Sequence, residues 1–287
     1  MPDTLECLAS LAASASPPAV VLVDNASRDL DTCAAERACP GVRLVRAAAN
    51  GGYAGGCNIG ARAANETGAE YLWFLNNDVV VAPDAAARLA AALDADAAAA
   101  VTGPVVRYYD TPGLVWSAGG RVHPWLGYTR HVAYRASSPP AGVRAVDFVS
   151  GAAMLVRHAA FEQLGGFDEA YFHYFEDADL CARGAARGWR SIVVPDAVVR
   201  HKVSASAGTR GSDRLNRAQA YYFARNRVRF VRRNWRGARR AVALAAQPAL
   251  VAYECAKALR AGNAAEARGR IEGLADGVRG RVGARRV

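Results

Sequence analysis

The feature that most constrains this chain is a short apolar run that ends abruptly in polar side chains. Residues 71–75 are all large and apolar, and Asn76, Asn77 and Asp78 follow directly. Such a run, bounded by turn formers, predicts a strand buried on both faces, with its C-terminal end at the ligand-binding edge of an α/β sheet. Oxygen donors there suit Mg²⁺ or Mn²⁺ bridging a phosphorylated ligand, with Asp78 holding the metal. A turn into the helix that opens near Pro83 is an equally good interpretation.

A second strand shows the same pattern earlier in the chain. Residues 20–23 are apolar, and Asp24, Asn25 and Ser27 lie at their end. Because a parallel sheet brings the C-termini of its strands to one edge, we expect Asp24 near Asp78, as an acceptor for a base or ribose. A helix precedes this strand, where a β-α-β crossover needs a strand first. We therefore expect the first strand of the fold to be missing from the chain.

A glycine-rich loop follows a third short strand at residues 42–45. It runs from Asn50 through Gly51, Gly52, Gly55 and Gly56 to Asn58 and leads into a helix. Such a loop lets the backbone approach a phosphate or a base and aims a helix N-terminus at it. The spacing G-x-G-x-x-G is absent, which disfavours a dinucleotide-dependent oxidoreductase. A tight turn that packs helix on sheet is the alternative.

The remaining pattern predicts an α/β fold. We expect helices over residues 84–93, 158–164 and 176–183, and strands over residues 98–104 and 146–156, the latter broken at Ser150-Gly151. A strand pair is expected around Pro195 within residues 189–199. Residues 105–145 have no clean period and read as a long insertion, with a hairpin as one possibility.

An acidic cluster opens the helix at residue 176. Glu176, Asp177 and Asp179 follow the aromatic run of residues 171–175. Acids in a first turn compensate the helix dipole, which is the structural interpretation. Beside apolar surface, however, the pKa of a carboxylate rises into the range of a base catalyst. His201 ends the last predicted strand and is a candidate metal ligand in a domain of this kind.

Charge is distributed unevenly along the 287 residues. From Arg200 onward the chain has 21 Lys and Arg against 5 Asp and Glu, whereas residues 1–199 have a net charge of −6. A basic tail suits anionic lipid, a phosphorylated substrate or nucleic acid, but no nucleic-acid-binding motif accompanies it. The uncharged run at residues 241–253 is too short to span a bilayer. Six scattered cysteines without metal-ligand spacing indicate reduced thiols in the cytoplasm.

In this order, the blocks resemble the family 2 glycosyltransferases of the GT-A fold, in particular the bacterial rhamnosyltransferase-like group. The resemblance covers residues 20–206 and rests on Asp24 to Ser27, Asn50 to Asn58, Leu75 to Asp78, Ser150 to Met154, Gly165 to Glu169, and Glu176 to Leu180 with His201. It implies a mixed, mainly parallel sheet flanked by helices, with a nucleotide-binding half at residues 1–104, an acceptor half at residues 105–210 and a basic helical extension at residues 211–287.

The resemblance also implies an inverting transfer from a nucleoside-diphosphate sugar to a hydroxyl of a glycan or polyprenyl-linked acceptor in cell-surface polysaccharide synthesis. Asp177 would be the catalytic base, and Asp78 and His201 would hold Mg²⁺ or Mn²⁺. The donor would contact Asp24, Asn25, Ser27, Asn50, Gly51, Gly55, Asn58, Asn76, Asn77 and Gly151. The acceptor would contact Phe167, Asp168, Glu176 and Asp179.

The chain departs from the family pattern in two places. Asn76 replaces the first carboxylate of the usual D-x-D motif, and the first strand is absent. A non-catalytic sugar-nucleotide-binding or glycan-binding relative is therefore the alternative. The arginine-rich helix of residues 222–235 also resembles these relatives, and the eight arginines of residues 225–240 predict binding to the inner face of the plasma membrane. Packing of this helix on the acidic catalytic domain is the alternative.

Overall fold

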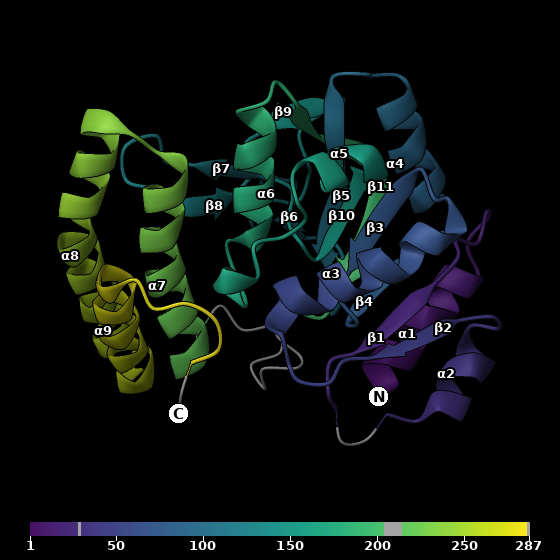
Figure 1. The fold of residues 1–287 in the computed structure, drawn as a ribbon, viewed down its shortest axis with the longest axis horizontal. Helices are drawn as coiled ribbons and strands as arrows, with labels where there is room; N and C mark the ends of the chain where they lie inside the picture. The colour runs from purple at the N-terminus through teal and green to yellow at the C-terminus, as the bar shows by residue number, and fades with distance from the viewer. Residues whose placement is uncertain (28–29, 204–213, 286–287) are drawn as a thin grey trace.

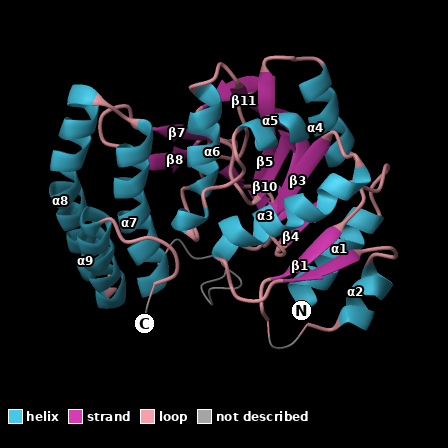
Figure 2. Cartoon of the chain, in the orientation of Figure 1, coloured by secondary structure: helices cyan, strands magenta, loops and turns pink. Residues whose placement is uncertain are grey.

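The central sheet is built from the apolar runs that the sequence marks as buried (Figures 1 and 2). The structure is a computed structural model that describes residues 1–27, 30–203 and 214–285. Within these ranges the sheet has seven strands in the order β3-β10-β5-β11-β4, with β6 paired to β5 and β9 to β11. The strands are β3 (Tyr71–Leu75), β4 (Val79–Val81), β5 (Ala99–Tyr108), β6 (Val115–Ser117), β9 (Arg144–Val146), β10 (Ala153–Arg157) and β11 (Arg190–His201).

The sheet is mixed, which confirms the predicted α/β fold, but parallel neighbours do not dominate it. Strand β11 runs parallel to β5, whereas β10 lies antiparallel between β3 and β5, and β4 is antiparallel to β11. Because β10 lies between β3 and β5, the two predicted halves of the domain share one sheet. An apolar run predicts burial but not strand direction, which the connections in space decide.

A second sheet consists of β1 (Val21–Asp24) and β2 (Arg43–Arg46), paired in parallel. Asp24 therefore ends a strand of a different sheet from the one that leads to Asp78, and the expectation of one common sheet is wrong. Helices α1 (Pro2–Ala12) and α2 (Thr32–Ala38) pack Leu8 and Ala35 beneath this small sheet. Cys7 and Leu11 of α1 also contact β4, so α1 joins the two sheets.

Two predicted irregular regions have a simple form in the structure. The insertion contains the antiparallel hairpin of β7 (Gly120–Val122) and β8 (Thr129–His131), as expected. The strand pair predicted around Pro195 is instead the single strand β11, whose pairing with β5 shifts between Val194 and Val198. Because both halves of β11 pair with β5, the proline makes a bulge and does not divide the strand.

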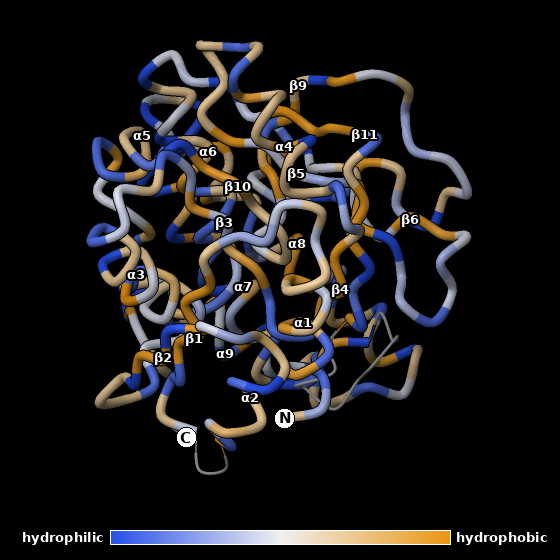
Figure 3. The backbone as a smooth tube through the Cα atoms, turned by 90° about the vertical axis from the view of Figure 1, so that its right-hand side faces the viewer, coloured by the Kyte–Doolittle hydropathy of each residue, from blue (hydrophilic) through white to orange (hydrophobic). Residues whose placement is uncertain are grey.

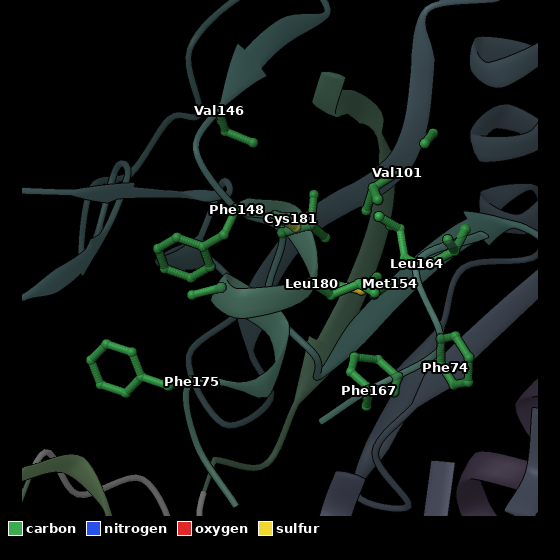
Figure 4. Close-up of a cluster of buried hydrophobic side chains, with 14 of the residues drawn as sticks. Phe74, Val101, Val146, Phe148, Met154, Leu164, Phe167, Phe175, Leu180 and Cys181 are labelled. Atoms are coloured by element: carbon green, nitrogen blue, oxygen red, sulfur yellow. The ribbon is translucent and has the colours of Figure 1, made fainter. Parts of the chain in front are cut away.

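Helices cover the central sheet and enclose the main core. They are α3 (Gly52–Ala64), α4 (Ala85–Asp94), α5 (His158–Gln163) and α6 (Glu176–Ala185), with single 3₁₀ turns η1 (Asn65–Thr67) and η2 (Glu169–Tyr171). Hydrophobic residues follow the central strands (Figure 3). Figure 4 shows Phe74 of β3 beside Phe167, with their ring centroids 4.9 Å apart. Burying such a side chain contributes about 1.5–3 kcal/mol, so these rings anchor the turn before η2.

The C-terminal residues form three helices at one side of the domain (Figure 1). These are α7 (Arg217–Asn234), α8 (Gly237–Arg260) and α9 (Ala264–Arg279). Gly269, Gly273 and Gly277 of α9 lie against the backbone of α7, where a Cβ on Gly273 would be 2.1 Å from the Tyr221 carbonyl oxygen. None of the helices in the described ranges is sufficiently long and apolar to cross a membrane. The predicted domain boundary near residue 210 lies outside the described residues.

Candidate active site

The glycine-rich loop is closed against two other segments. Gly52 has a φ of +70°, and a Cβ there would lie 2.1 Å from the Phe172 carbonyl oxygen, so a side chain cannot be accommodated. Asn25 fixes the same loop, because its Nδ2 donates to the Gly52 carbonyl at 2.8 Å and its Oδ1 accepts from the Gly51 N–H at 3.0 Å. Asn50 Oδ1 accepts from the Gly52 N–H. Asn25 and Asn50 therefore shape the loop, and any donor contact would come in addition.

Asp24 lies beside this loop as an ionised acceptor. It is buried, its Oδ1 accepts the Ser27 N–H at 2.7 Å, and Arg46 Nε lies 3.1 Å from its Oδ2. The Ser27 backbone hydrogen bond, followed in effect by the Ser27 side chain and Arg46, lowers the pKa of Asp24 against the opposing effect of burial. Ser27 itself is exposed.

Asp78 and His201 meet where β11 ends and β4 begins, as the metal hypothesis requires. Their Oδ1 and Nε2 atoms are 3.0 Å apart, and both side chains are about 5% exposed. Two neighbouring ligands of an octahedral ion at about 2.1 Å are themselves about 3 Å apart. Asn76 Nδ2 lies 3.4 Å from His201 Nε2, so an amide joins the pair. Carboxylate and imidazole fit a divalent cation that keeps phosphate oxygens as its other ligands, whereas the Asn76 nitrogen is a hydrogen-bond donor and not a metal ligand.

The protein by itself offers a metal ion few ligands in the described ranges. Groups of three or more His, Cys, Asp or Glu that could hold a metal ion are absent there. A cation at Asp78 and His201 would accordingly depend on a bound diphosphate to complete its coordination.

Asp177, in the first turn of α6, is held against the break at Ser150-Gly151. Its Oδ2 accepts the Gly151 N–H at 2.9 Å and its Oδ1 accepts the Ala178 N–H at 2.7 Å. Burial raises the pKa of Asp177, and these two backbone N–H groups oppose the rise. The side chain is only half-buried, so a substrate hydroxyl can reach it. A reachable carboxylate with a raised pKa has the properties of a general base.

Glu176 precedes Asp177 but is less suited to this role. It is 4% exposed, and its Oε2 has no hydrogen-bond partner in the described part of the chain. Burial, followed by the charge of Asp177, raises the pKa of Glu176 well above its ordinary value. A buried and a half-buried carboxylate that are neighbours do not ionise together readily, so Asp177, with its two N–H donors, ionises first.

The loop before α6 is strained and is held by α7. Phe172, Tyr174 and Phe175 have φ values of +66°, +68° and +73°, a region that costs about 1–3 kcal/mol for residues other than glycine. Asn226, which is fully buried, places its Nδ2 within 3.0 Å of the carbonyl oxygens of Tyr171, His173 and Tyr174. The neighbouring Arg225 donates to the carbonyls of Ala170 and Tyr171. Helix α7 therefore completes the site, because it fixes the backbone that leads to Asp177.

This packing supports the alternative interpretation of the arginine-rich helix, in which it packs on the catalytic domain. Arg225 and Arg227 are buried, and Arg227 bonds Gln247 and Glu254 of α8. Arg229 pairs with Asp168 at 2.6 Å. Helix α7 therefore packs on the catalytic domain, as the alternative interpretation expected, and these arginines are not available to a membrane.

Several residues predicted to bind donor or acceptor are used inside the domain. Asn58 donates to the Phe167 carbonyl and to Glu169, and accepts from the Phe167 N–H. Phe167 is 2% exposed and belongs to the core. Asn77 Nδ2 donates to Thr4 of α1. Gly55 is buried within helix α3, which begins at Gly52, so most of the predicted glycine-rich loop is helical. These residues of the family motif therefore make contacts inside the domain. The motif alone does not show which of its residues have such structural contacts.

Asp168 and Asp179 form an ion-pair network with α6 and α7. Asp179 is fully buried and accepts from Tyr171, Arg183 and Asn234. At Asp168 burial is the largest single influence and opposes ionisation, but the hydrogen bond and charge of Arg229, the Ala170 N–H and the charge of Arg233 together lower the pKa of Asp168. These contacts give both carboxylates structural roles and leave acceptor binding by them as a prediction.

Sequence reasoning missed three residues that border the site. Tyr53, in the glycine-rich segment, donates its hydroxyl to the Gly151 carbonyl. The ring of Trp116, from the insertion, lies edge-on to His201 with centroids 4.8 Å apart. The ring of His131 lies against the ring of Trp116. Burial of His131, together with the charge of His201, lowers the pKa of His131 to about 4. Only Tyr53 had a usable signal, as the one large side chain among the glycines at the start of the loop.

Two cavities near α6 and α7 lie away from this chemistry. They have volumes of about 650 and 500 Å³, share Arg183 and Arg233, and have neither Asp78 nor Asp177 in their lining. Their arginines bond the carboxylates of the ion-pair network and the last carbonyls of α7 and α9. We therefore assign the site to the strand ends and the glycine-rich loop.

The sequence profile of the family described as glycosyltransferase like family 2 matches residues 2–222. The chain belongs to glycosyltransferase family 2. Its relatives include N-acetylglucosaminyl-diphospho-decaprenol L-rhamnosyltransferase of Mycobacterium tuberculosis, which is 36% identical over 224 residues, covering 70% of this chain and 72% of the relative. Rhamnosyltransferase WbbL of Escherichia coli is 48% identical over 50 residues, which cover 17% of this chain and 19% of the relative. Family membership confirms that the protein is a glycosyltransferase.

Solved structures confirm the GT-A fold of this glycosyltransferase. A mannosyltransferase of Pyrobaculum calidifontis in complex with GDP-Man and Mn²⁺ has a TM-score of 0.58 and 20% identity, covering 96% of this chain and 83% of its own. GalNAc-T7 with UDP, GalNAc and Mn²⁺ has a TM-score of 0.62 and 19% identity, covering 83% of this chain and 44% of its own. TarS of S. aureus with UDP-GlcNAc has a TM-score of 0.56 and 14% identity, covering 97% and 88%.

Proposed function

We propose that this glycosyltransferase transfers a sugar, with inversion, from a nucleoside-diphosphate sugar to a hydroxyl of a lipid-linked glycan acceptor. The observation that supports the proposal is the way in which residues 150–152 connect the two reactive groups. The Ala152 carbonyl accepts the Asn76 N–H at 3.0 Å beside the Asp78 and His201 pair, and the Gly151 N–H donates to Asp177 at 2.9 Å. A diphosphate-binding pair and a base therefore lie on either side of one short backbone segment.

The reaction follows from these positions as a single displacement. Asp177 accepts the proton of the acceptor hydroxyl while its oxygen forms a bond to the anomeric carbon, and the bond from that carbon to the diphosphate breaks. Attack and departure on opposite faces of the sugar invert the anomeric centre. The N-terminus of α3 directs the positive end of its helix dipole toward the negative charge that collects on the leaving group, whereas the N–H groups of Gly51 and Gly52 are already bonded to Asn25 and Asn50.

Asp78 and His201 would hold Mg²⁺ or Mn²⁺. When bound, such an ion neutralises the developing charge of the diphosphate as a Lewis acid. Asp24 would receive a hydrogen bond from the base or ribose of the donor, because it is ionised and lies beside the loop. Mn²⁺ in the P. calidifontis mannosyltransferase and in GalNAc-T7 supports a divalent cation in this fold.

The curated relatives guide the choice of substrates. Both named relatives are rhamnosyltransferases, and the mycobacterial one is named for a decaprenyl-diphosphate acceptor. We therefore infer a nucleoside-diphosphate rhamnose donor and a polyprenyl-diphosphate sugar acceptor. Such an acceptor is presented at a membrane, so the enzyme would act in the cytoplasm at the inner face of the plasma membrane.

A donor screen tests the proposal. Purified protein with Mn²⁺ or Mg²⁺ is incubated with nucleoside-diphosphate sugars, with and without a short-chain polyprenyl-diphosphate N-acetylglucosamine, and nucleoside-diphosphate release is measured. We expect acceptor-dependent release with a rhamnose donor. Release with no donor in the panel, although the donors bind, would favour a binding protein and refute the proposal.

A further inference from the structure

The outer faces of α8 and α9 expose an unusual concentration of apolar side chains. Six of the nine large exposed apolar residues in the described ranges lie in residues 242–282, among them Tyr253 at 68%, Ile271 at 59% and Leu259 at 57%. Both helices lie on the side of α7 that faces away from the central sheet (Figure 1). We call the exposed apolar side chains of the two helices the bundle outer face: Val242, Tyr253, Leu259, Ile271 and Val278. A grouped apolar face of this kind marks a binding surface.

Helix α8 is apolar on both of its sides, unlike an ordinary surface helix. Its inner side packs Ala243, Val251 and Cys255 in the bundle. Its outer side repeats small and apolar residues at intervals of three and four, from Val242 through Ala245, Ala249, Ala252 and Ala256 to Leu259. A solvent-facing helix normally has charged residues in those positions. The apolar outer side of α8 therefore indicates that another molecule covers this side of the helix.

The charges around the bundle outer face favour an anionic cover. Arg240, Lys257 and Arg260 of α8 are exposed, and so are Arg268 and Arg279 of α9, which pair with Glu272 and Asp276 of their own helix. The acids of the two helices are all engaged by arginines of the bundle: Glu254 with Arg227, Glu266 with Arg270, Glu272 with Arg217 and Asp276 with Arg281. A second copy packed on the same face by two-fold symmetry would bring these basic residues together. Lipid headgroups of negative charge would neutralise them.

We propose that the bundle outer face lies on an anionic lipid bilayer, with Val242, Tyr253 and Leu259 in the interfacial layer. This deepens the proposed function, because it names the surface through which the enzyme meets a lipid-linked acceptor. It also moves the membrane contact from the arginine-rich helix α7, which is packed, to α8 and α9. Helix α7 then lies between the bilayer and the loop that holds Asp177, with Asn226 bonded to that loop.

Vesicle co-sedimentation of the full chain tests the inference. We expect wild-type protein to sediment with vesicles containing phosphatidylglycerol, not with pure phosphatidylcholine, and to be released by high salt. The triple variant Arg240→Glu, Lys257→Glu, Arg260→Glu should bind at least about a hundredfold more weakly, from the attraction of each basic residue to an anionic surface. Its matched control is Arg37→Glu, Arg144→Glu, Arg187→Glu, three exposed arginines of the catalytic domain, and should bind almost as wild type does.

Substitution of the apolar residues gives an independent test. Val242→Ser, Tyr253→Ser, Leu259→Ser together should weaken vesicle binding, whereas Val143→Ser, at an equally exposed valine, should not. Unchanged binding by both triple variants, or no binding by wild type, refutes the inference. A wild-type dimer in light scattering that the serine variant dissociates would also refute it, in favour of a second copy. Transfer to a water-soluble short-chain acceptor should be equal in all variants. If no variant and no wild-type protein transfers sugar, the proposed function is refuted. The sedimentation result still decides whether the bundle outer face binds a membrane.

Discussion

Replacement of Asn226 should damage catalysis through the loop before α6, although Asn226 touches no proposed substrate. Its Nδ2 lies 3.0, 2.7 and 2.7 Å from the carbonyl oxygens of Tyr171, His173 and Tyr174. An amide has two hydrogens, so these contacts amount to about two hydrogen bonds, one of them shared. Its Oδ1 accepts from Arg225 Nε at 2.8 Å.

The expected magnitude follows from burial. Each buried partner left without its hydrogen bond costs about 1–3 kcal/mol, so Asn226→Ala should lower the free energy of unfolding by about 2–4 kcal/mol. The loop has three residues with positive φ, each costing about 1–3 kcal/mol, and it relaxes once Asn226 no longer holds it. Because that relaxation moves the start of α6, kcat should fall more than tenfold while the Kd of the donor changes little.

Urea unfolding and steady-state transfer measure the two effects. Asn226→Asp keeps the shape and faces the three carbonyls with oxygen atoms only, so it should be at least as damaging as Asn226→Ala. Asn234→Ala is the matched control, because Asn234 is an amide of the same helix that bonds Asp179 and the Phe230 carbonyl and not the loop. It should lower stability and leave kcat nearly unchanged. Equal kcat losses in Asn226→Ala and Asn234→Ala would show that general destabilisation, and not loop positioning, is responsible.

Three further predictions follow from the site. Asp177→Asn should abolish transfer and leave donor binding nearly intact, measured by calorimetry and product formation, because an amide cannot accept the proton; loss of donor binding as well would indicate a structural acid. EDTA should stop transfer, Mn²⁺ or Mg²⁺ should restore it, and Asp78→Ala should raise the metal concentration needed at least tenfold, whereas full activity in EDTA would contradict the assignment of Asp78 and His201. The folded-state pKa of Glu176 is raised above the ordinary value of 4.5, so the stability that its protonated form contributes is present below that pH and is lost as pH rises through the folded pKa. Glu176→Gln should therefore gain stability relative to wild type between about pH 5 and pH 8, measured by urea midpoints, and an identical pH slope in both proteins would show that Glu176 does not titrate in this way.

The sequence by itself determined the elements and the chemistry of the strand ends. The apolar run of residues 71–75 forms the strand β3 as predicted, but only Leu72 and Phe74 are buried, and the alternate residues Tyr71, Trp73 and Leu75 are half-buried. The polar residues that follow the apolar runs, Asp24 and Asp78, are buried, although they belong to different sheets. Asp78 does meet His201, as the order of the motifs led us to expect, and the roles of these residues and of Asp177 stay predictions.

Only the tertiary structure decided how these pieces are joined. Strand β10 lies antiparallel between β3 and β5, and the β1 and β2 pair forms its own sheet, because pairing depends on contacts between segments far apart in the chain. Separation along the chain is also the reason that the partners of Asn58 and Asn77 could not be predicted. The Asn58 amide bonds Phe167, which is 109 residues away, and the Asn77 amide bonds Thr4, which is 73 residues away. Asn226 is the clearest case. Its sequence neighbours are arginines of a basic helix, yet the packing of α7 on the domain places its amide against three carbonyl oxygens of the strained loop, and no local pattern encodes a contact made across 55 residues.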